Sequence, residues 1–322
     1  TSRAMGIISA ILLSVAIAFT CGTVTMWISR MIFSFRYMAL FRRFGAMWCG
    51  VSLTAIVYFA LFKGLKSTFA ESAAAVWIDH NLPAALALCW VACSVLLAFL
   101  QLFRINILRI TILSGTFALA LAFAGNDLVN FIGVPVAGFD AYSIAREAGN
   151  TDVVMSALNE NIPANMIFML TAGAIMVLTL WTSRKAMHVT ETEISLSAQS
   201  SDDESQYGSN VFSRGIVRLS INAATAIERV TPLKVREFVA RRFEYVDVEH
   251  SGAPYDMIRA TVNLTTSALL ISLATSLTLP LSATYVCFMV AMGSSLADKA
   301  WGRESAVYRI TGVMTVVMGW FT

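Results

Sequence analysis

A short polar stretch interrupts a long apolar run, and it limits what this chain can fold into. Residues 107–139 are mostly apolar, yet Gly125, Asn126, Asp127 and Asn130 lie among them. Carboxylates and carboxamides are costly in hydrocarbon, so they are seldom there for packing alone. As one helix the run would be about 50 Å long, against about 30 Å of hydrocarbon in a bilayer. We expect the helix to break near Gly125 and Asn126, and such a break frees backbone groups that can bind ions.

The composition agrees with a chain that crosses a membrane several times. Hydrophobic residues make up 57% of the 322 residues and charged residues 13%, which favours an all-α polytopic membrane protein over a soluble domain. The net charge of +3 is spread over the loops and indicates no nucleic-acid partner. No signal peptide is recognisable, and the chain ends inside an apolar run, so we expect an internal piece of a longer protein.

Flanking charges predict the direction of each crossing. Residues 6–28 are followed by Arg30, Arg36, Arg42 and Arg43 without an acidic neighbour, so the loop after this first segment is expected in the cytoplasm. Residues 140–161 carry four acidic side chains and one arginine, which suits the outer side. The remaining crossings are then expected to be outward at 45–65, inward at 82–103, outward at 107–139 and inward at 162–182.

A second apolar run, residues 257–296, is also too long for one crossing, at about 60 Å if helical. Pro280 prevents an unperturbed helix at its centre. Arg259 lies at its start, and Lys299 and Arg303 follow it, so both ends are expected in the cytoplasm. We therefore predict a re-entrant helical hairpin with its turn near Pro280.

An internal repeat is the next expectation. Arg3-x-x-Gly6 opens the first segment, and Arg309-x-x-Gly312 opens the last one, residues 307–322. With the hairpin in place, these two segments run in opposite directions, as an inverted-topology repeat requires. The predicted fold is thus an inverted-repeat secondary transporter with discontinuous helices.

Residues 183–252 form the longest polar region and are predicted to be cytoplasmic. Within it, residues 195–209 have the composition of a disordered linker. Residues 211–243 show helical spacing, with a helix start at Thr231 and Pro232. Two interpretations stay open for this part: amphipathic helices on the membrane surface, or charged helices in solvent. The basic face consists of Lys234, Arg236, Arg241 and Arg242.

The two interruptions offer the chemistry of an oxyanion site. Ser282 and Thr284 supply hydroxyls, and helix starts supply N–H groups and a favourable dipole. Asp127 repels an anion unless a cation or proton lies between them, so we expect it to bind a coupling cation or to accept a hydrogen bond from a protonated oxyanion. The alternatives are that the hydroxyls bond to their own backbone and that Asn126 and Asp127 cap a helix. Cys89 and Cys93 are interpreted as small buried hydrophobes and not as a metal pair.

Two motifs resemble those of the inorganic phosphate transporter (PiT) family. Residues 125–130, G-N-D-L-V-N, resemble its G-x-N-D-x-x-N signature with one residue fewer before Asn126. Residues 279–285, L-P-L-S-A-T-Y, resemble its P-x-S-T-T-H hairpin motif. The family carries each motif twice, once per inverted repeat. The resemblance covers residues 111–182 and 253–322 well and 1–45 loosely.

The resemblance implies a symporter of inorganic phosphate with Na⁺ or H⁺, commonly a dimer, in the plasma (inner cell) membrane. It implies no cofactor besides the coupling cation, and Asp127 as a possible Na⁺ ligand. Ala283 and Tyr285 replace a threonine and a histidine of the motif, and Asn263 stands near a position where many members have glutamate. The coupling ion therefore stays open. The candidate phosphate ligands are Asn126, Asp127, Asn130, Ser282 and Thr284.

On the same reading the chain divides into five parts. They are the end of the first repeat (1–66), a connecting segment (67–110), the first part of the second repeat (111–182), the cytoplasmic loop (183–252), and the hairpin with the following helix (253–322).

Sulfate transport and a receptor role are the alternatives to phosphate transport. A sulfate transporter would use the same scaffold, and a non-transporting membrane receptor would use the long loop. An enzyme is not expected, because the chain has no Ser-His-Asp, His-Glu-x-x-His or phosphate-loop arrangement.

Overall fold

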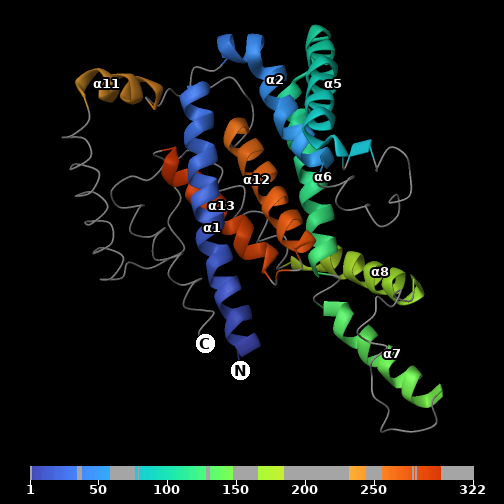
Figure 1. Cartoon of the computed structure of the whole chain (residues 1–322). Helices are drawn as coiled ribbons and strands as arrows, with labels where there is room; N and C mark the ends of the chain where they lie inside the picture. The colour runs from blue at the N-terminus through green and yellow to red at the C-terminus, as the bar shows by residue number, and fades with distance from the viewer. Residues whose placement is uncertain are drawn as a thin grey trace.

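The computed structural model is helical wherever it describes the chain (Figure 1). It describes residues 2–34, 38–58, 77–78, 80–127, 131–147, 166–184, 232–243, 256–277, 279 and 281–298. These residues form nine α-helices and no strand. The helices are α1 (Ser2–Ile32), α2 (Met38–Val57), α5 (Leu82–Leu102), α6 (Ile107–Asp127), α7 (Gly133–Glu147), α8 (Met166–Thr182), α11 (Leu233–Arg242), α12 (Met257–Ser276) and α13 (Ala283–Ala297).

Five of these helices are long and apolar enough to cross a bilayer. Their apolar stretches have 18 to 24 residues, which at 1.5 Å per residue gives about 27–36 Å and matches the hydrocarbon thickness. The chain is thus an integral membrane protein, and the predicted all-α class is confirmed. The five stretches are Ser9–Ile32, Leu40–Val57, Leu82–Leu102, Ile107–Asn126 and Met257–Ser276.

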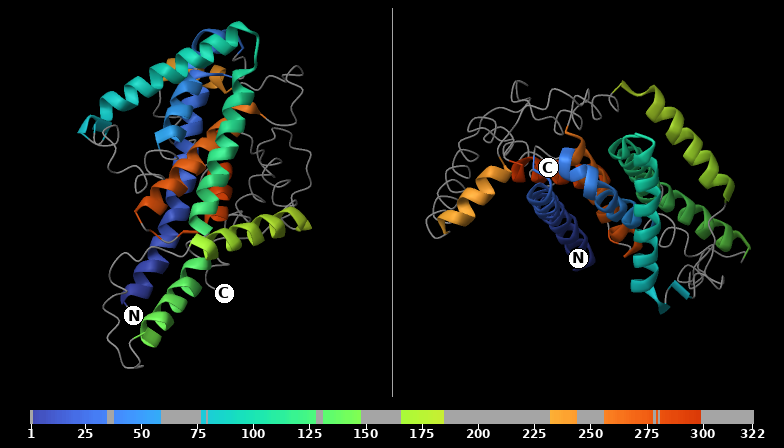
Figure 2. Two further views of the ribbon diagram at one scale, coloured as in Figure 1. Left: turned by 90° about the vertical axis from the view of Figure 1, so that its right-hand side faces the viewer. Right: turned by 90° about the horizontal axis from the view of Figure 1, so that it is seen from above.

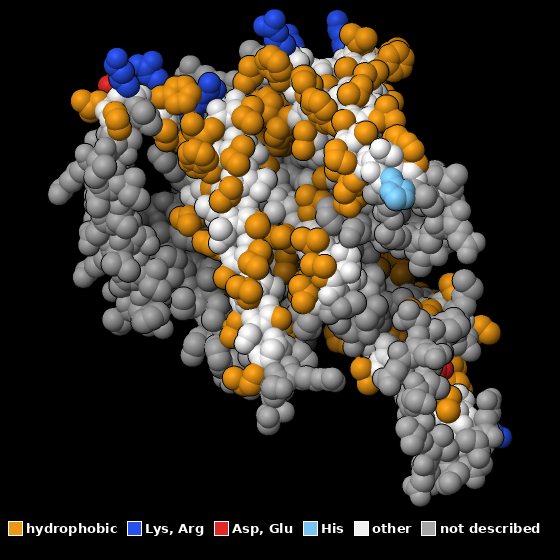
Figure 3. Space-filling view, in the orientation of Figure 1, with side chains coloured by type: hydrophobic (Ala, Val, Ile, Leu, Met, Phe, Trp, Pro, Cys, Tyr) orange, Lys and Arg blue, Asp and Glu red, His pale blue; other side chains and the backbone are white. Residues whose placement is uncertain are grey.

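One end of the helix bundle carries many of the described arginines, and we call it the arginine end. Figure 3 shows blue side chains gathered there above a broad hydrophobic surface. The Gln101 amide near the end of α5 donates to the carbonyl oxygen of Arg42 at the start of α2 (3.0 Å). Arg30 at the end of α1 contacts Asp256 at the start of α12 (2.7 Å). Hence α1 and α5 end here while α2, α6 and α12 begin here (Figure 1). Which end of the bundle faces the cytoplasm stays a prediction.

Helices α12 and α13 form a helical hairpin, as predicted, and its re-entrant character stays a prediction. Helix α12 ends at Ser276 and α13 begins at Ala283, so the chain is interrupted around Pro280, which itself lies outside the described residues. Asp298 directly follows α13, and its carboxylate lies 2.5 Å from the guanidinium of Arg259 in the first turn of α12. Both ends of the hairpin therefore lie at the arginine end, and its turn lies at the opposite end, which we call the motif end.

The structure does not end the helix at Gly125 and Asn126, where the break was predicted, and residues 128–130 lie outside the described residues. Helix α6 continues through Gly125 and Asn126 to Asp127, and α7 begins at Gly133. A glycine weakens a helix by about 1 kcal/mol but does not block it sterically. Pro135 falls in the first turn of α7, a position where proline is tolerated, and this favours a helix start after the polar motif.

The predicted inward crossing at residues 162–182 is not what the structure shows. Helix α8 has 17 residues and lies across the long axis of the bundle, beside the end of α6 (Figures 1 and 2). None of its described side chains is buried. Uniform apolarity places a helix in hydrocarbon, but it does not specify an orientation, because lipid and protein surfaces accept the same side chains.

The tightest helix packing joins α1 to α13. A β-carbon on Gly22 would overlap the carbonyl oxygen of Val290, and one on Gly293 would overlap the carbonyl oxygen of Phe19. Small residues let helix backbones approach closely, which is a main source of helix association in membranes. This contact holds the hairpin against α1 between the arginine end and the motif end.

Several predictions fall wholly or partly outside the described residues. These are the last segment (307–322) and with it the repeat, the linker (195–209), and the amphipathic helix before residue 231. Helix α11 is described and begins directly after Pro232, as predicted. It leaves Leu233 and Phe238 exposed and packs near the end of α1.

Candidate functional site

The structure places the described part of the two motifs at the same end of the bundle. Asn126 lies in the last turn of α6 and is 4% exposed. Asp127 is the last residue of α6; its side chain and all of Asn130 lie outside the described atoms. Ser282 is the half-buried residue that precedes α13, and Thr284 is exposed in the first turn of that helix.

Packing joins the end of α6 to the hairpin turn. Leu119 of α6 belongs to the same buried cluster as Leu281 and Ala283 of the hairpin, and Ala122 packs against that cluster. Asn126 follows Ala122 by one helical turn and therefore lies on the same face of α6. Two segments more than 150 residues apart in the sequence thus meet at the motif end.

The two helix starts of the hairpin differ in how they are capped. At α12, the Asp256 carboxylate accepts from the backbone N–H groups of Ile258 (2.8 Å) and Arg259 (3.2 Å). At α13, the Ser282 side chain makes no capping hydrogen bond. A helix start that is not capped by its own side chain favours an anion, through its N–H groups and its dipole.

A further hydroxyl at the motif end was not among the predicted ligands. Thr275, in the last turn of α12, has a buried Oγ1 without a hydrogen-bond partner. Buried polar atoms almost always have a partner, which is sometimes a water or a ligand. Many described threonines bond to their own helix, for example Thr261 of α12 to the carbonyl oxygen of Met257 (2.8 Å), whereas Thr265 of α12 also lacks a partner. That common pattern is why Thr275 could not be singled out from sequence.

Charged side chains at the arginine end form a cluster that sequence reasoning missed. Arg30, Asp256, Arg259 and Asp298 make up this cluster, which we call the clasp. The Arg30 guanidinium holds the Asp298 carboxylate through two bonds, from Nε to Oδ1 (2.5 Å) and from Nη2 to Oδ2 (2.6 Å), and it also bonds Asp256 (2.7 Å). Arg259 bonds the same Asp298 Oδ2 from Nη2 (2.5 Å) and Nε (3.2 Å).

The clasp is buried and electrically balanced. Arg30 and Arg259 have no exposed surface, and Asp298 is 2% exposed. Burial alone would raise the pKa of Asp256, but the charges of Arg30 and Arg259 outweigh burial, so this pKa lies below its ordinary value. The prediction that Arg30 belongs to a cytoplasmic loop is corrected: it lies in the last turn of α1. The sequence did hold a signal for this cluster, because Asp256 and Asp298 flank the apolar run of the hairpin.

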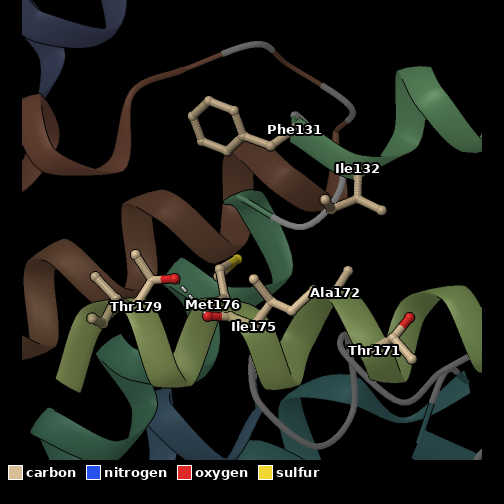
Figure 4. A pocket seen from close by; sticks show the side chains of 8 residues that line it. Phe131, Ile132, Thr171, Ala172, Ile175, Met176 and Thr179 are labelled. Atoms are coloured by element: carbon tan, nitrogen blue, oxygen red, sulfur yellow. Dashed lines mark hydrogen bonds between the residues drawn. The ribbon is translucent and has the colours of Figure 1, made fainter. Parts of the chain in front are cut away.

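A separate hollow of about 480 Å³ lies between the start of α7 and α8 (Figure 4). Its two hydroxyls are bonded within α8, from Thr171 to the carbonyl oxygen of Ile167 (2.9 Å) and from Thr179 to that of Ile175 (2.7 Å). No charged side chain lines it, so it does not suit an oxyanion. Its lining consists of Phe131, Ile132, Thr171, Ala172, Ile175, Met176, Thr179 and Leu180.

Neither a cluster of metal ligands nor a similar known protein helps to define the candidate site. Within the described ranges, no group of three His, Cys, Asp or Glu side chains is placed to hold a metal ion. No family model, curated protein or solved structure matches the chain. The resemblance of the two motifs to phosphate transporters therefore stays a prediction from the residues themselves.

Proposed function

We propose that this chain is part of a cation-coupled transporter of inorganic phosphate, and that its substrate site lies at the motif end. The observation that carries the proposal is the meeting of two polar interruptions from distant parts of the chain. One ends α6 with Asn126 and Asp127, and the other precedes α13 with Ser282. Secondary transporters build substrate sites where interrupted helices from different parts of the chain meet.

The available groups suit a partly protonated tetrahedral oxyanion. Ser282, Thr284 and Thr275 carry hydroxyls, Asn126 carries an amide, and α13 starts without a side-chain cap. These groups donate hydrogen bonds without carrying a full positive charge, so bound anion can also be released. Asp127 adds a negative charge beside the anion. That charge is tolerable only with a cation or a proton between them, and this makes transport depend on Na⁺ or H⁺.

The experiment is uptake by the full-length protein in liposomes. We expect saturable uptake of labelled phosphate that is driven by an imposed Na⁺ or H⁺ gradient and that excess unlabelled phosphate suppresses. Stronger suppression by sulfate than by phosphate would point to the sulfate transporter instead. Gradient-independent binding of phosphate without uptake would contradict the transporter and support a receptor.

A further inference from the structure

The clasp contains every charged side chain that is buried in the described part of the molecule, and it joins two separate structural units. Three of its members, Asp256, Arg259 and Asp298, belong to the hairpin. The fourth, Arg30, belongs to α1. The hairpin members alone carry a net charge of −1, and Arg30 makes the cluster neutral. Separating α1 from the hairpin would therefore leave an unbalanced buried charge unless water enters.

A buried cluster of ion pairs has two favourable arrangements in general, closed and dry or open and hydrated. Charges in a dry interior interact strongly only while all partners are in place, and water replaces those partners once a gap opens. Arg30 holds Asp298 through two parallel bonds, a geometry that is either formed or lost as a unit. Such a contact is suited to a switch between two states.

The packing of the two ends shows which alternative the structure adopts. Around the clasp, Met26, Phe33 and Ile258 have no exposed surface. At the hairpin turn, Leu277 is 55% exposed and Leu279 is 48% exposed, whereas Leu281 and Ala283 are buried. The structure therefore has the clasp closed and dry.

A pivot lies between these ends. The backbones of α1 and α13 touch at Gly22 and Gly293, with Arg30 about 12 Å further along α1. Since no side chain separates the two backbones at this point, the hairpin can tilt about it while the contact persists. Tilting about a point between two ends opens one end as it closes the other.

We propose that the clasp is the latch of a gate at the arginine end, and that its opening lets the hairpin tilt about the glycine contact, which opens the arginine end and closes the motif end. Only the purpose of the gate rests on the proposed function, because a transporter must expose its site to each side of the membrane in turn. The gate itself is tested without any substrate.

The test measures how fast two introduced thiols react in full-length protein held in lipid nanodiscs, where a soluble maleimide reaches both ends. Ser29→Cys reports on the arginine end, because Ser29 is 3% exposed beside Arg30. Ser276→Cys reports on the motif end, where Ser276 is exposed. Peptide mass spectrometry reads each site separately, so the five native cysteines stay in place.

The opening variant is Arg30→Gln with Asp256→Asn. It removes one charge of each sign, keeps the Arg259–Asp298 pair, and leaves asparagine, a good helix cap, at the start of α12. We expect labelling of Ser29→Cys to rise at least tenfold and labelling of Ser276→Cys to fall. Arg30→Lys keeps the charge without the two-bond fork, so it should change both rates in the same directions by less. Arg109→Gln, an exposed arginine of the same end, should change neither rate.

Three results would overturn the gate: unchanged labelling at Ser29→Cys in both clasp variants, a rise there without a fall at Ser276→Cys, or an equal effect of Arg109→Gln. The second result would mean that the clasp only holds the fold together. Phosphate uptake is measured on the full-length protein with its clasp intact. Reciprocal labelling without phosphate uptake would refute the proposed function and keep the gate, whereas uptake without reciprocal labelling would refute the gate alone.

Discussion

The two ends of the bundle solve the problem of polar groups in a membrane differently. At the arginine end the chain supplies both signs of charge, and each buried carboxylate of the clasp meets a guanidinium. At the motif end, Asn126 and the Thr275 hydroxyl are buried, while Ser282 does not cap its helix. A cluster whose opposite charges pair with one another has a structural or switching role. A buried hydroxyl without a partner, that of Thr275, near a helix start that no side chain caps is suited to be completed by a ligand.

The largest expected effect comes from unbalancing the clasp. Arg30→Gln leaves two carboxylates against one guanidinium in a buried place, and removing one member of a buried ion pair costs about 3–5 kcal/mol. We expect a strongly lowered Tm in detergent micelles. Adding Asp256→Asn restores neutrality and should recover much of the lost stability. Equal melting of Arg30→Gln and Arg109→Gln would contradict the assignment of the clasp.

A smaller effect is expected at the glycine contact between the two ends. Gly293→Ala places a β-carbon against the carbonyl oxygen of Phe19, and such overpacking typically costs about 1–3 kcal/mol. Gly173→Ala in α8 meets open space and should be neutral or stabilising by up to about 1 kcal/mol. Thermal unfolding of both variants checks this, and a destabilised Gly173→Ala with an unaffected Gly293→Ala would reverse the prediction.

At the motif end the expected effect is on binding and not on stability. Ser282→Ala removes a hydroxyl that does not cap α13, so Tm should hardly change. A hydrogen bond to a charged group contributes about 1.5–3 kcal/mol, so phosphate Kd should rise at least about tenfold. Ser276→Ala is the matched control, because that hydroxyl donates to the carbonyl oxygen of Leu273 (2.7 Å). Equal Kd values for the two variants would remove Ser282 from the site.

The smallest expected effect is that of pH on the stability contributed by the clasp, which should hardly change near neutral pH. The folded pKa of Asp256 lies below its ordinary value, which is about 4. Its stabilising contribution is therefore complete above pH 4 and is lost as the pH falls through the lower, folded pKa. The difference in Tm between the wild type and Asp256→Asn should stay constant from about pH 8 to about pH 5 and shrink below about pH 4. A difference that already shrinks at pH 6 would mean that Arg30 and Arg259 do not hold this carboxylate ionised.

Much of the fold follows from local sequence signals. Helix α5 was expected at residues 82–103 and spans Leu82–Leu102, because polar residues flank it and a proline lies in its first turn. The hairpin followed from Pro280 and from the charges at both ends of its apolar run. In each case a residue next to the helix limit has a chemical property that ends or begins a helix.

Long-range pairing and orientation could not be predicted in the same way. Arg30 lies 226 residues from Asp256 and 268 residues from Asp298, and no local pattern selects those partners. The orientation of α8 depends on packing that its uniform apolarity does not encode. At the site, the two motifs were found from their unusual polarity, whereas Thr275 resembles the many hydroxyls that bond to their own helix.

The central claim is that the motif end binds an oxyanion together with a cation, and Asp127→Asn tests it most directly. The change keeps size and hydrogen bonding but removes the charge. The measurement is phosphate Kd of the full-length protein at low and high Na⁺, and then across pH, for wild type and variant. In the wild type, phosphate and the cation should strengthen each other's binding by linkage, and in Asp127→Asn this enhancement should fall towards zero while Tm is maintained. Unchanged enhancement in the variant would contradict the account, because Asp127 would then have no part in ion coupling.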